Sequence, residues 1–320
     1  MKKILKTLGI ILGIIVLAIA GLLAYAKLTP MKTFPVKAPV VQIPTDSASL
    51  AFGEKIVVNV CAHCHLGNDG KLSGRQFSQK EDPFGEMWTA NITQHPDKGI
   101  GTYSDGELAY LIRTGINRNG RFVGYMMCHP QMSDKDMASV IAYLRSDADI
   151  MKPSEAQHPT PDYLSSALVK TLVLLNVYSP LAYDGKPVSA PPVSDKVAFG
   201  RYLATDIYEC ATCHSASFET MNLLEPEKSS GFFGGGNPVP DEDFNLVNSA
   251  NLTPSKKFGL GNWTEEQFIR AVKTGQKPDG TILKNQMPRL GLLSDEEVSA
   301  IWAYLQTVPV LENDPTKPSK

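Results

Sequence analysis

Apolar residues recur at helical spacing in four segments of the chain, each directly after a helix-capping pattern. The first two segments begin at Ser104 and Ser133, and each serine is followed three residues later by an acidic side chain. The other two begin at Thr264 and Ser294, with Gln or Glu at the same distance. Apolar positions three and four residues apart line one face of a helix, and no stretch shows a sustained two-residue alternation. The pattern therefore predicts an all-α fold.

The N-terminal segment, residues 1–26, differs because its apolar positions are continuous. Three lysines precede an apolar run over residues 8–26, and these nineteen residues suffice to cross a bilayer as a helix. Ala24-Tyr25-Ala26 also fits a signal-peptide cleavage site. We expect an uncleaved membrane-anchor helix, because a secretory signal has a shorter apolar region of about 7–15 residues. The basic end would stay in the cytoplasm, with the rest of the chain in the periplasm or on the outer face of the inner membrane.

The remainder of the chain repeats itself once. Three segments of the first copy return in the second: Ala-Phe-Gly at 51–53 and 198–200, Ala-Asn-Ile/Leu-Thr at 90–93 and 250–253, and Ala-Tyr-Leu at 142–144 and 303–305. Two copies of about a hundred residues each indicate a tandem duplication of one small domain.

These patterns divide the chain into six parts. Residues 1–26 are the membrane anchor or signal, 27–47 a proline-containing linker, 48–147 the first domain, 148–194 an interdomain segment, 195–310 the second domain and 311–320 a tail. The interdomain segment has an apolar centre, which we expect to form a helix packed on or between the domains. The tail is polar and is expected to be disordered.

Each repeat contains one Cys-x-x-Cys-His motif, either Cys61-Ala62-His63-Cys64-His65 or Cys210-Ala211-Thr212-Cys213-His214. Two thiols at this spacing add to the two vinyl groups of one porphyrin, and the adjacent histidine reaches the iron from the same side. A zinc site or a redox dithiol also fits one isolated motif, but two motifs in matching surroundings favour haem attachment. We therefore predict two covalently bound haem c groups, held by Cys61, Cys64 and His65 and by Cys210, Cys213 and His214. The fifth cysteine, Cys128, is left unpaired and is expected to be a buried, inert side chain.

The second axial ligand of each iron is predicted from the methionines. Met126 and Met287 each lie seven residues before the serine that caps the last helix of their repeat. A thioether ligand raises the potential of the iron, and we assign these two residues as the ligands opposite the motif histidines. In the first repeat Met127 and His129 remain alternatives, because Met127 stands where the second repeat has Pro288.

With these motifs the chain resembles class I type cytochrome c domains arranged in tandem. More specifically, it is similar to the cytochrome c subunits of bacterial membrane-bound alcohol and gluconate dehydrogenases. The resemblance covers residues 48–147 and 195–308 and includes the Ala-Asn-Ile/Leu-Thr segments, a Gly-x-Gly, an Arg/Lys-Thr-Gly and the terminal Ala-Tyr-Leu. Those relatives usually carry three haem domains, whereas this chain has two motifs. Their usual Met-Pro is present at Met287-Pro288 and is replaced by Met126-Met127.

The resemblance implies membrane-tethered periplasmic electron transfer rather than an enzymatic activity. The partners would be a dehydrogenase or quinol-side donor and an oxidase or soluble carrier, without a small-molecule substrate. Subtracting the three N-terminal lysines from the 31 basic residues leaves 28, against 33 acidic residues, so nothing indicates a nucleic-acid partner. The alternative function is that of a dihaem peroxidase-like enzyme whose first haem has an open distal site.

Overall fold

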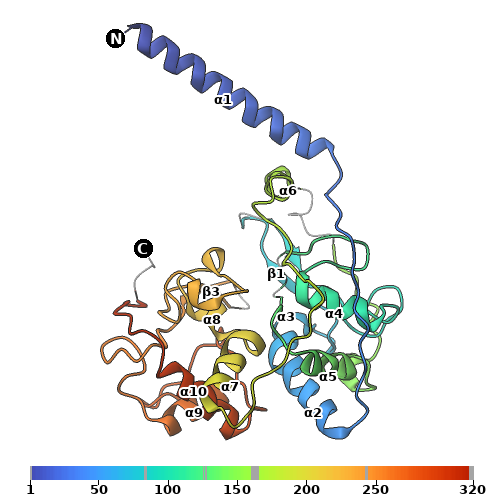
Figure 1. Ribbon diagram of the computed structural model, residues 1–320, viewed down its shortest axis with the longest axis vertical. Helices are drawn as coiled ribbons and strands as arrows, with labels where there is room; N and C mark the ends of the chain where they lie inside the picture. The colour runs from blue at the N-terminus through green and yellow to red at the C-terminus, as the bar shows by residue number, and fades with distance from the viewer. Residues whose placement is uncertain are drawn as a thin grey trace.

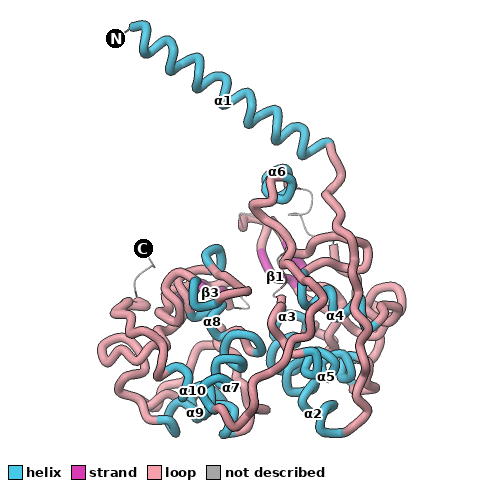
Figure 2. The backbone as a smooth tube through the Cα atoms, viewed as in Figure 1, coloured by secondary structure: helices cyan, strands magenta, loops and turns pink. Residues whose placement is uncertain are grey.

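The structure is a computed structural model that describes residues 2–82, 85–124, 126, 128–159, 166–241 and 244–316. It is mostly helical, with one long helix projecting from the body (Figures 1 and 2). The helical elements up to the interdomain segment are α1 (Lys2–Leu28), α2 (Ser47–Ile56), η1 (Val57–Cys61), α3 (Ala62–His65), α4 (Asp105–Thr114), α5 (Asp134–Leu144), η2 (Asp149–Met151) and α6 (Ala167–Leu174). Those that follow are α7 (Lys196–Tyr202), η4 (Leu203–Ile207), α8 (Cys210–His214), η5 (Phe218–Thr220), η6 (Pro226–Lys228), α9 (Glu265–Thr274) and α10 (Asp295–Leu305).

The four helices that the capping patterns predicted are α4, α5, α9 and α10. Ser104, Thr264 and Ser294 form complete capping boxes, in which the N-cap and the third residue of the helix satisfy each other's backbone N–H. Ser133 also accepts the N–H of Asp136, but here the Asp136 carboxylate accepts the Tyr202 hydroxyl, which in turn accepts the Ser133 N–H. The all-α prediction is therefore confirmed in part, because the fold is mostly helical but also contains strands.

Two short antiparallel hairpins were not predicted. One pairs β1 (Gln76–Ser78) with β2 (Met87–Trp88), and the other pairs β3 (Pro238–Pro240) with β4 (Leu246–Asn248). Strands of two or three residues are too short to show an alternating pattern in the sequence.

The same helix pair builds the core of each half. Helix α2 packs on α5, and α7 packs on α10. Each contact is close because of one glycine: a Cβ at Gly53 would lie 1.9 Å from the Ser139 carbonyl oxygen, and a Cβ at Gly200 would lie 1.8 Å from that of Ala300. Both first helices then run into a π-helical segment, η1 or η4, which leads to the Cys-x-x-Cys-His motif. The repeated Ala-Phe-Gly is thus the point of closest helix contact.

The two halves pack side by side through reciprocal contacts (Figure 1). The Lys55 Nζ lies 2.8 Å from a Glu297 carboxylate oxygen, so the end of α2 reaches the start of α10. At the equivalent positions, the Tyr202 hydroxyl donates to the Asp136 carboxylate at 2.5 Å, so the end of α7 reaches the start of α5. Contacts that recur with the two halves exchanged are the mark of an approximately twofold interface. A single hydrophobic cluster continues across it.

The segment between α1 and α2 is extended, and it is held against the first half. Thr33 forms an isolated β-bridge with Arg121, the Phe34 N–H donates to the Gly120 carbonyl at 2.8 Å, and the Tyr110 hydroxyl donates to the Pro35 carbonyl at 3.2 Å. Helix α1 is long and apolar enough to cross a membrane, and its most apolar stretch is wholly unburied. The docked segment fixes the point from which α1 leaves the body.

The start of the predicted tail is also bound to the body. The Asn251 side-chain amide donates to the carbonyls of Leu311 and Asn313, and the Asn313 amide donates to those of Gly234 and Gly235. These hydrogen bonds hold residues 311–313 against the second half.

Candidate haem sites

The first Cys-x-x-Cys-His motif spans the end of η1 and the single turn α3. The Cys61 and Cys64 side chains are half-buried. Burial, and then the neighbouring Cys64, raise the pKa of Cys61 to about 12, and burial raises the pKa of Cys64 as well. Reactive or metal-binding cysteines have a lowered pKa. The thiols thus lack the activation of a redox dithiol, and no group of three or more His, Cys, Asp or Glu side chains within the described residues could hold a metal ion. The pair is compatible with thioether attachment to a haem.

The first histidine is oriented by a backbone carbonyl. The His65 Nδ1 lies 2.7 Å from the Ala90 carbonyl oxygen. Burial lowers the pKa of His65, so the ring is neutral. A neutral ring that donates its Nδ1–H to a carbonyl keeps the Nε2 lone pair for a metal. This is the state that an axial haem ligand requires.

The second motif repeats this arrangement on α8. Burial, followed by charged neighbours, raises the pKa of Cys210 and of Cys213 to about 12. The His214 Nδ1 lies 2.8 Å from the Ala250 carbonyl oxygen, and burial lowers the pKa of the ring. Among the charges that act on Cys213 is the thiol of Cys64 in the other half.

The repeated Asn-Ile/Leu-Thr segments position these carbonyls. The Asn91 Oδ1 accepts the backbone N–H and the hydroxyl of Thr93, and its amide donates to the carbonyls of Ser154 and Ala156. Asn251 makes the same two bonds to Thr253. Because Asn91 directly follows Ala90, this buried turn fixes the carbonyl that orients His65.

Backbone hydrogen bonds establish the register of the two methionines. The His129 N–H donates to the Ile112 carbonyl, as the Leu290 N–H donates to the Val272 carbonyl, so His129 and Leu290 are equivalent. Met126 and Met287 each lie three residues before these positions, and each donates its N–H to the carbonyl three residues earlier. Both side chains are half-buried. The equivalence predicted from the sequence thus has a matching backbone geometry.

The alternatives in the first half differ in their surroundings. Met127 lies outside the described residues. The His129 Nδ1 lies 3.2 Å from the Asp206 carbonyl oxygen and 3.4 Å from a Glu209 carboxylate oxygen, so this ring faces the second half. Cys128 is buried, its thiol lies 3.4 Å from the Met126 carbonyl oxygen, and burial raises its pKa to about 12. These contacts favour Met126 over His129 and an inert Cys128.

Glu209 is a residue that the sequence pattern did not reveal. It precedes Cys210, has a left-handed backbone with φ of 46°, and is 3% exposed. Burial raises its pKa to about 8, and burial lowers the pKa of His129. Both groups are therefore neutral near pH 7, and their contact is not an ion pair. No local sequence signal marks such a residue, because its partner lies 80 positions away in the other half.

Three buried polar atoms have no hydrogen-bond partner within the described part of the chain: Asn59 Nδ2, Trp88 Nε1 and the Tyr208 hydroxyl. Asn59 and Tyr208 each lie two residues before the first cysteine of their motif. Buried donors of this kind require an acceptor, and a haem brings carboxylate acceptors in its propionates. With two thiols and one neutral histidine in each half, the residues present fit haem c.

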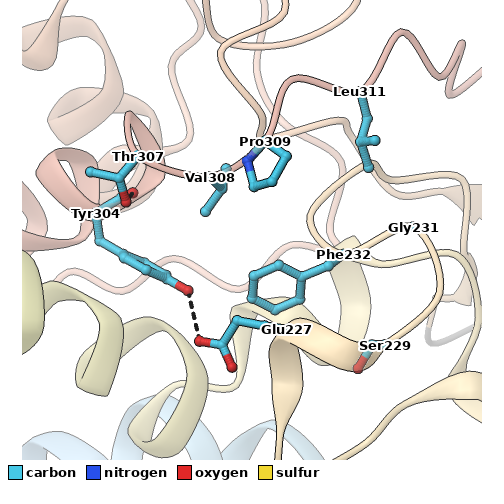
Figure 3. Close-up of a pocket in the computed structure, with 9 residues that line it drawn as sticks. All are labelled: Glu227, Ser229, Gly231, Phe232, Tyr304, Thr307, Val308, Pro309 and Leu311. Carbon is cyan, nitrogen blue, oxygen red and sulfur yellow. Dashed lines mark hydrogen bonds between the residues drawn. The ribbon is translucent and has the colours of Figure 1, made fainter.

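The pocket in Figure 3 is separate from these residues. It has a volume of about 480 Å³ and lies between η6 and the end of α10. Its polar groups are already paired, because the Tyr304 hydroxyl donates to Glu227 at 3.2 Å and the Arg201 guanidinium donates to the same carboxylate at 2.6 Å. None of its lining residues is a predicted haem ligand, and the pairing indicates a structural role.

Comparison with known proteins agrees with the resemblance. The cytochrome c family model matches residues 50–147. The chain is 27% identical to the fructose dehydrogenase cytochrome subunit of Gluconobacter japonicus, over 78% of this chain and 50% of that protein. It is 26% identical to the cytochrome c subunit of the quinone alcohol dehydrogenase of Gluconacetobacter polyoxogenes, over 82% of this chain and 57% of that protein.

A third relative is similar in length as well. The diheme cytochrome c-type protein of Cereibacter sphaeroides is 26% identical over 81% of this chain and 86% of that protein. By contrast, the chain spans about half the length of the dehydrogenase subunits that it matches. Residues 50–147 match the cytochrome c family, and most of the chain is similar to the cytochrome c subunits of dehydrogenases.

Proposed function

We propose that this chain is a dihaem electron-transfer protein with two tandem cytochrome c domains, residues 48–147 and 195–310. The observation that carries the proposal is the duplicated site. Each half has sheltered thiols and a histidine whose Nδ1 meets an alanine carbonyl, at 2.7 Å in the first half and 2.8 Å in the second. The family match covers the first half. The matching helix pairs and Asn-x-Thr turns support the same assignment for the second.

The proposed roles follow from the chemistry of each residue. Cys61 and Cys64, and likewise Cys210 and Cys213, would hold the porphyrins as thioethers. His65 and His214 would be the proximal iron ligands, and Met126 and Met287 the distal ones. When bound, haem c supplies reversible one-electron chemistry, while the protein supplies ligands, burial and orientation. The carbonyls of Ala90 and Ala250 hold the imidazole rings in the required tautomer.

The proposed path of electrons runs through both halves. The reciprocal interface packs the two halves directly against each other, which suits transfer between the haems without a bound substrate. Helix α1 would tether the protein to the inner membrane, with both domains in the periplasm or on the outer face. A membrane-bound dehydrogenase or quinol-side enzyme is the proposed donor, and the dehydrogenase is supported by related chains that are named as cytochrome subunits of dehydrogenases. The acceptor would be an oxidase or a soluble carrier.

A peroxidase is the weaker candidate. It requires an iron with an open distal position, whereas both halves offer a methionine in the same backbone register. The relatives compared above are named as dehydrogenase subunits or as a diheme cytochrome, not as peroxidases.

A redox titration of the purified full-length protein, followed by absorption spectra, tests the function. We expect two reversible one-electron transitions and no change when cyanide or peroxide is added to the ferric form. Cyanide binding to one ferric haem together with catalytic peroxide consumption would overturn the carrier assignment in favour of the enzyme.

A further inference from the structure

Helix α6 packs against the C-terminal end of α1, where α1 meets the body. The two helices are in contact, and in Figure 1 α6 lies at the end of the body from which α1 departs. Ala26 of α1 is fully buried in this contact, although nearly all of α1 is exposed. The Lys170 Nζ donates to the Thr29 carbonyl at 3.0 Å, and the Lys32 Nζ donates to the Asn176 side chain at 2.9 Å. These polar contacts join α6 and the segment just after it to the end of the anchor.

One face of α6 holds it on the body. Val169 and Val173 are each 1% exposed and form a small hydrophobic cluster with Met87 and Phe122 of the first half. Met31 and Phe34 of the extended segment after α1 pack on the same cluster. The position of α6 relative to α1 is therefore fixed by a shared apolar core.

The other face of α6 and the turn just after the helix present exposed apolar side chains. Leu168 is 53% exposed, Leu175 56% and Val177 71%. Leu168 and Leu175 are seven residues apart, which places them on one side of the helix, away from Val169 and Val173. Within residues 166–183, Lys170 is the sole charged residue, and its amine is bonded to the Thr29 carbonyl. A surface so poor in charge suits lipid better than a polar protein partner.

We infer that α6 is a second membrane contact, which inserts Leu168, Leu175 and Val177 into the outer interface of the bilayer beside α1. A membrane-spanning α1 ends at that interface, and an apolar surface fixed beside its last turns must lie at the same depth. The basic side chains of Lys27 and Lys32 flank the contact, at a height where cationic groups reach the lipid headgroups. Two attachments, instead of one flexible tether, would hold the haem domains in one orientation over the membrane.

The inference rests on the proposed tethering by α1, and the test separates the two. The full-length holoprotein is reconstituted at high lipid-to-protein ratio into phosphatidylcholine vesicles. Single cysteines are introduced by Leu17→Cys within α1, Leu175→Cys after α6, and Val193→Cys. Leu17 is 73% exposed and Val193 is 68% exposed, so all three sites are open in the protein itself. Val193 precedes α7, which lies at the opposite end of the body from α6 (Figure 1), and the unsubstituted chain measures any reaction of Cys128.

The rate of alkylation by a membrane-impermeant maleimide is measured at each site. We expect Leu175→Cys and Leu17→Cys to react at least about tenfold more slowly than Val193→Cys, because a thiol in lipid forms little of the reactive thiolate. Photolysis of phosphatidylcholine that carries a diazirine acyl chain should also yield a lipid adduct within residues 166–183 of the unsubstituted protein.

Each other outcome overturns a defined statement. If Leu17→Cys is slow but Leu175→Cys reacts as fast as Val193→Cys, α1 is an anchor and the inference on α6 is wrong. If Leu17→Cys is also fast, the tethering in the proposed function is wrong. If Leu175→Cys is slow without a lipid adduct, protein covers this face, and the assignment to lipid is wrong.

Discussion

Replacement of Glu209 by glutamine tests the protonation state of the buried carboxyl group that lies between the two halves. Glu209 is 3% exposed, its carboxylate oxygen lies 3.4 Å from the His129 Nδ1, and its pKa is raised to about 8 by burial. In the unfolded chain the carboxyl has an ordinary pKa near 4.5. Between these values the folded protein holds one proton more than the unfolded protein at this site, so the free energy of unfolding falls as the pH rises. Glutamine keeps the shape of the neutral acid and removes the titration.

The size of the effect follows from the linkage relation. One bound proton changes the free energy of unfolding by about 1.4 kcal/mol per pH unit. Between pH 6 and pH 7.5 the Glu209→Gln protein should gain about 2 kcal/mol relative to the unsubstituted protein. The neighbouring Asp206, whose pKa burial raises to about 6, and Cys128, whose pKa lies at about 12, titrate outside most of this window. Both groups interact electrostatically with Glu209, so the comparison of the two proteins is confined to this window.

The assay is denaturant unfolding of the full-length holoprotein in detergent at several pH values, followed by circular dichroism. The slope of the transition should be equal for both proteins, so that the shift in midpoint reports stability. Glu219→Gln, at an exposed position, is the matched control. Its free energy of unfolding should depend on pH as that of the unsubstituted protein does. If the free energy of unfolding of Glu209→Gln had the same pH dependence as that of the unsubstituted protein, the statement that the buried carboxyl is protonated in the folded state would be refuted.

Further substitutions test the sites and the packing. Met287→Ala should abolish the methionine-to-iron charge-transfer band of one haem, and an unchanged band would remove Met287 as a ligand. Met126→Ala should change the ferric spectrum of the other haem while His129→Ala leaves its ligand set intact, and the reverse result would make that haem bis-histidine. Gly53→Ala places a Cβ 1.9 Å from the Ser139 carbonyl oxygen and should lower the free energy of unfolding by at least about 1–3 kcal/mol, whereas Gly13→Ala, with nothing within 4 Å, should not change the thermal midpoint.

Much of the fold can be predicted from local sequence patterns. The caps at Ser104, Thr264 and Ser294 each depend on a residue three positions away, so the helix starts are readable from the chain alone. The Cys-x-x-Cys-His motifs can also be recognised in the sequence, because attachment to a porphyrin fixes the spacing of their residues. The hairpins are too short for a periodic pattern, and so the sequence did not predict them.

The contacts between the halves had no comparable signal. Asp136 stands where a capping-box acid is expected, yet its carboxylate binds Tyr202 in the other half. Glutamate side chains are usually exposed to solvent. Glu209 is buried because residues that are distant in the sequence pack around it. The register of Met126 was ambiguous in the sequence, since Met127 replaces a proline, whereas the backbone bonds at Val123 and His129 give one alignment. Tertiary packing decides these features, and it is not encoded in local spacing.

The mass of the denatured full-length protein shows whether both halves carry a haem. Two covalent haems per chain are predicted. Cys61→Ala together with Cys64→Ala should leave one, and Cys210→Ala together with Cys213→Ala should leave the other. A denatured, unsubstituted protein that retains only one haem, or none, would contradict the account.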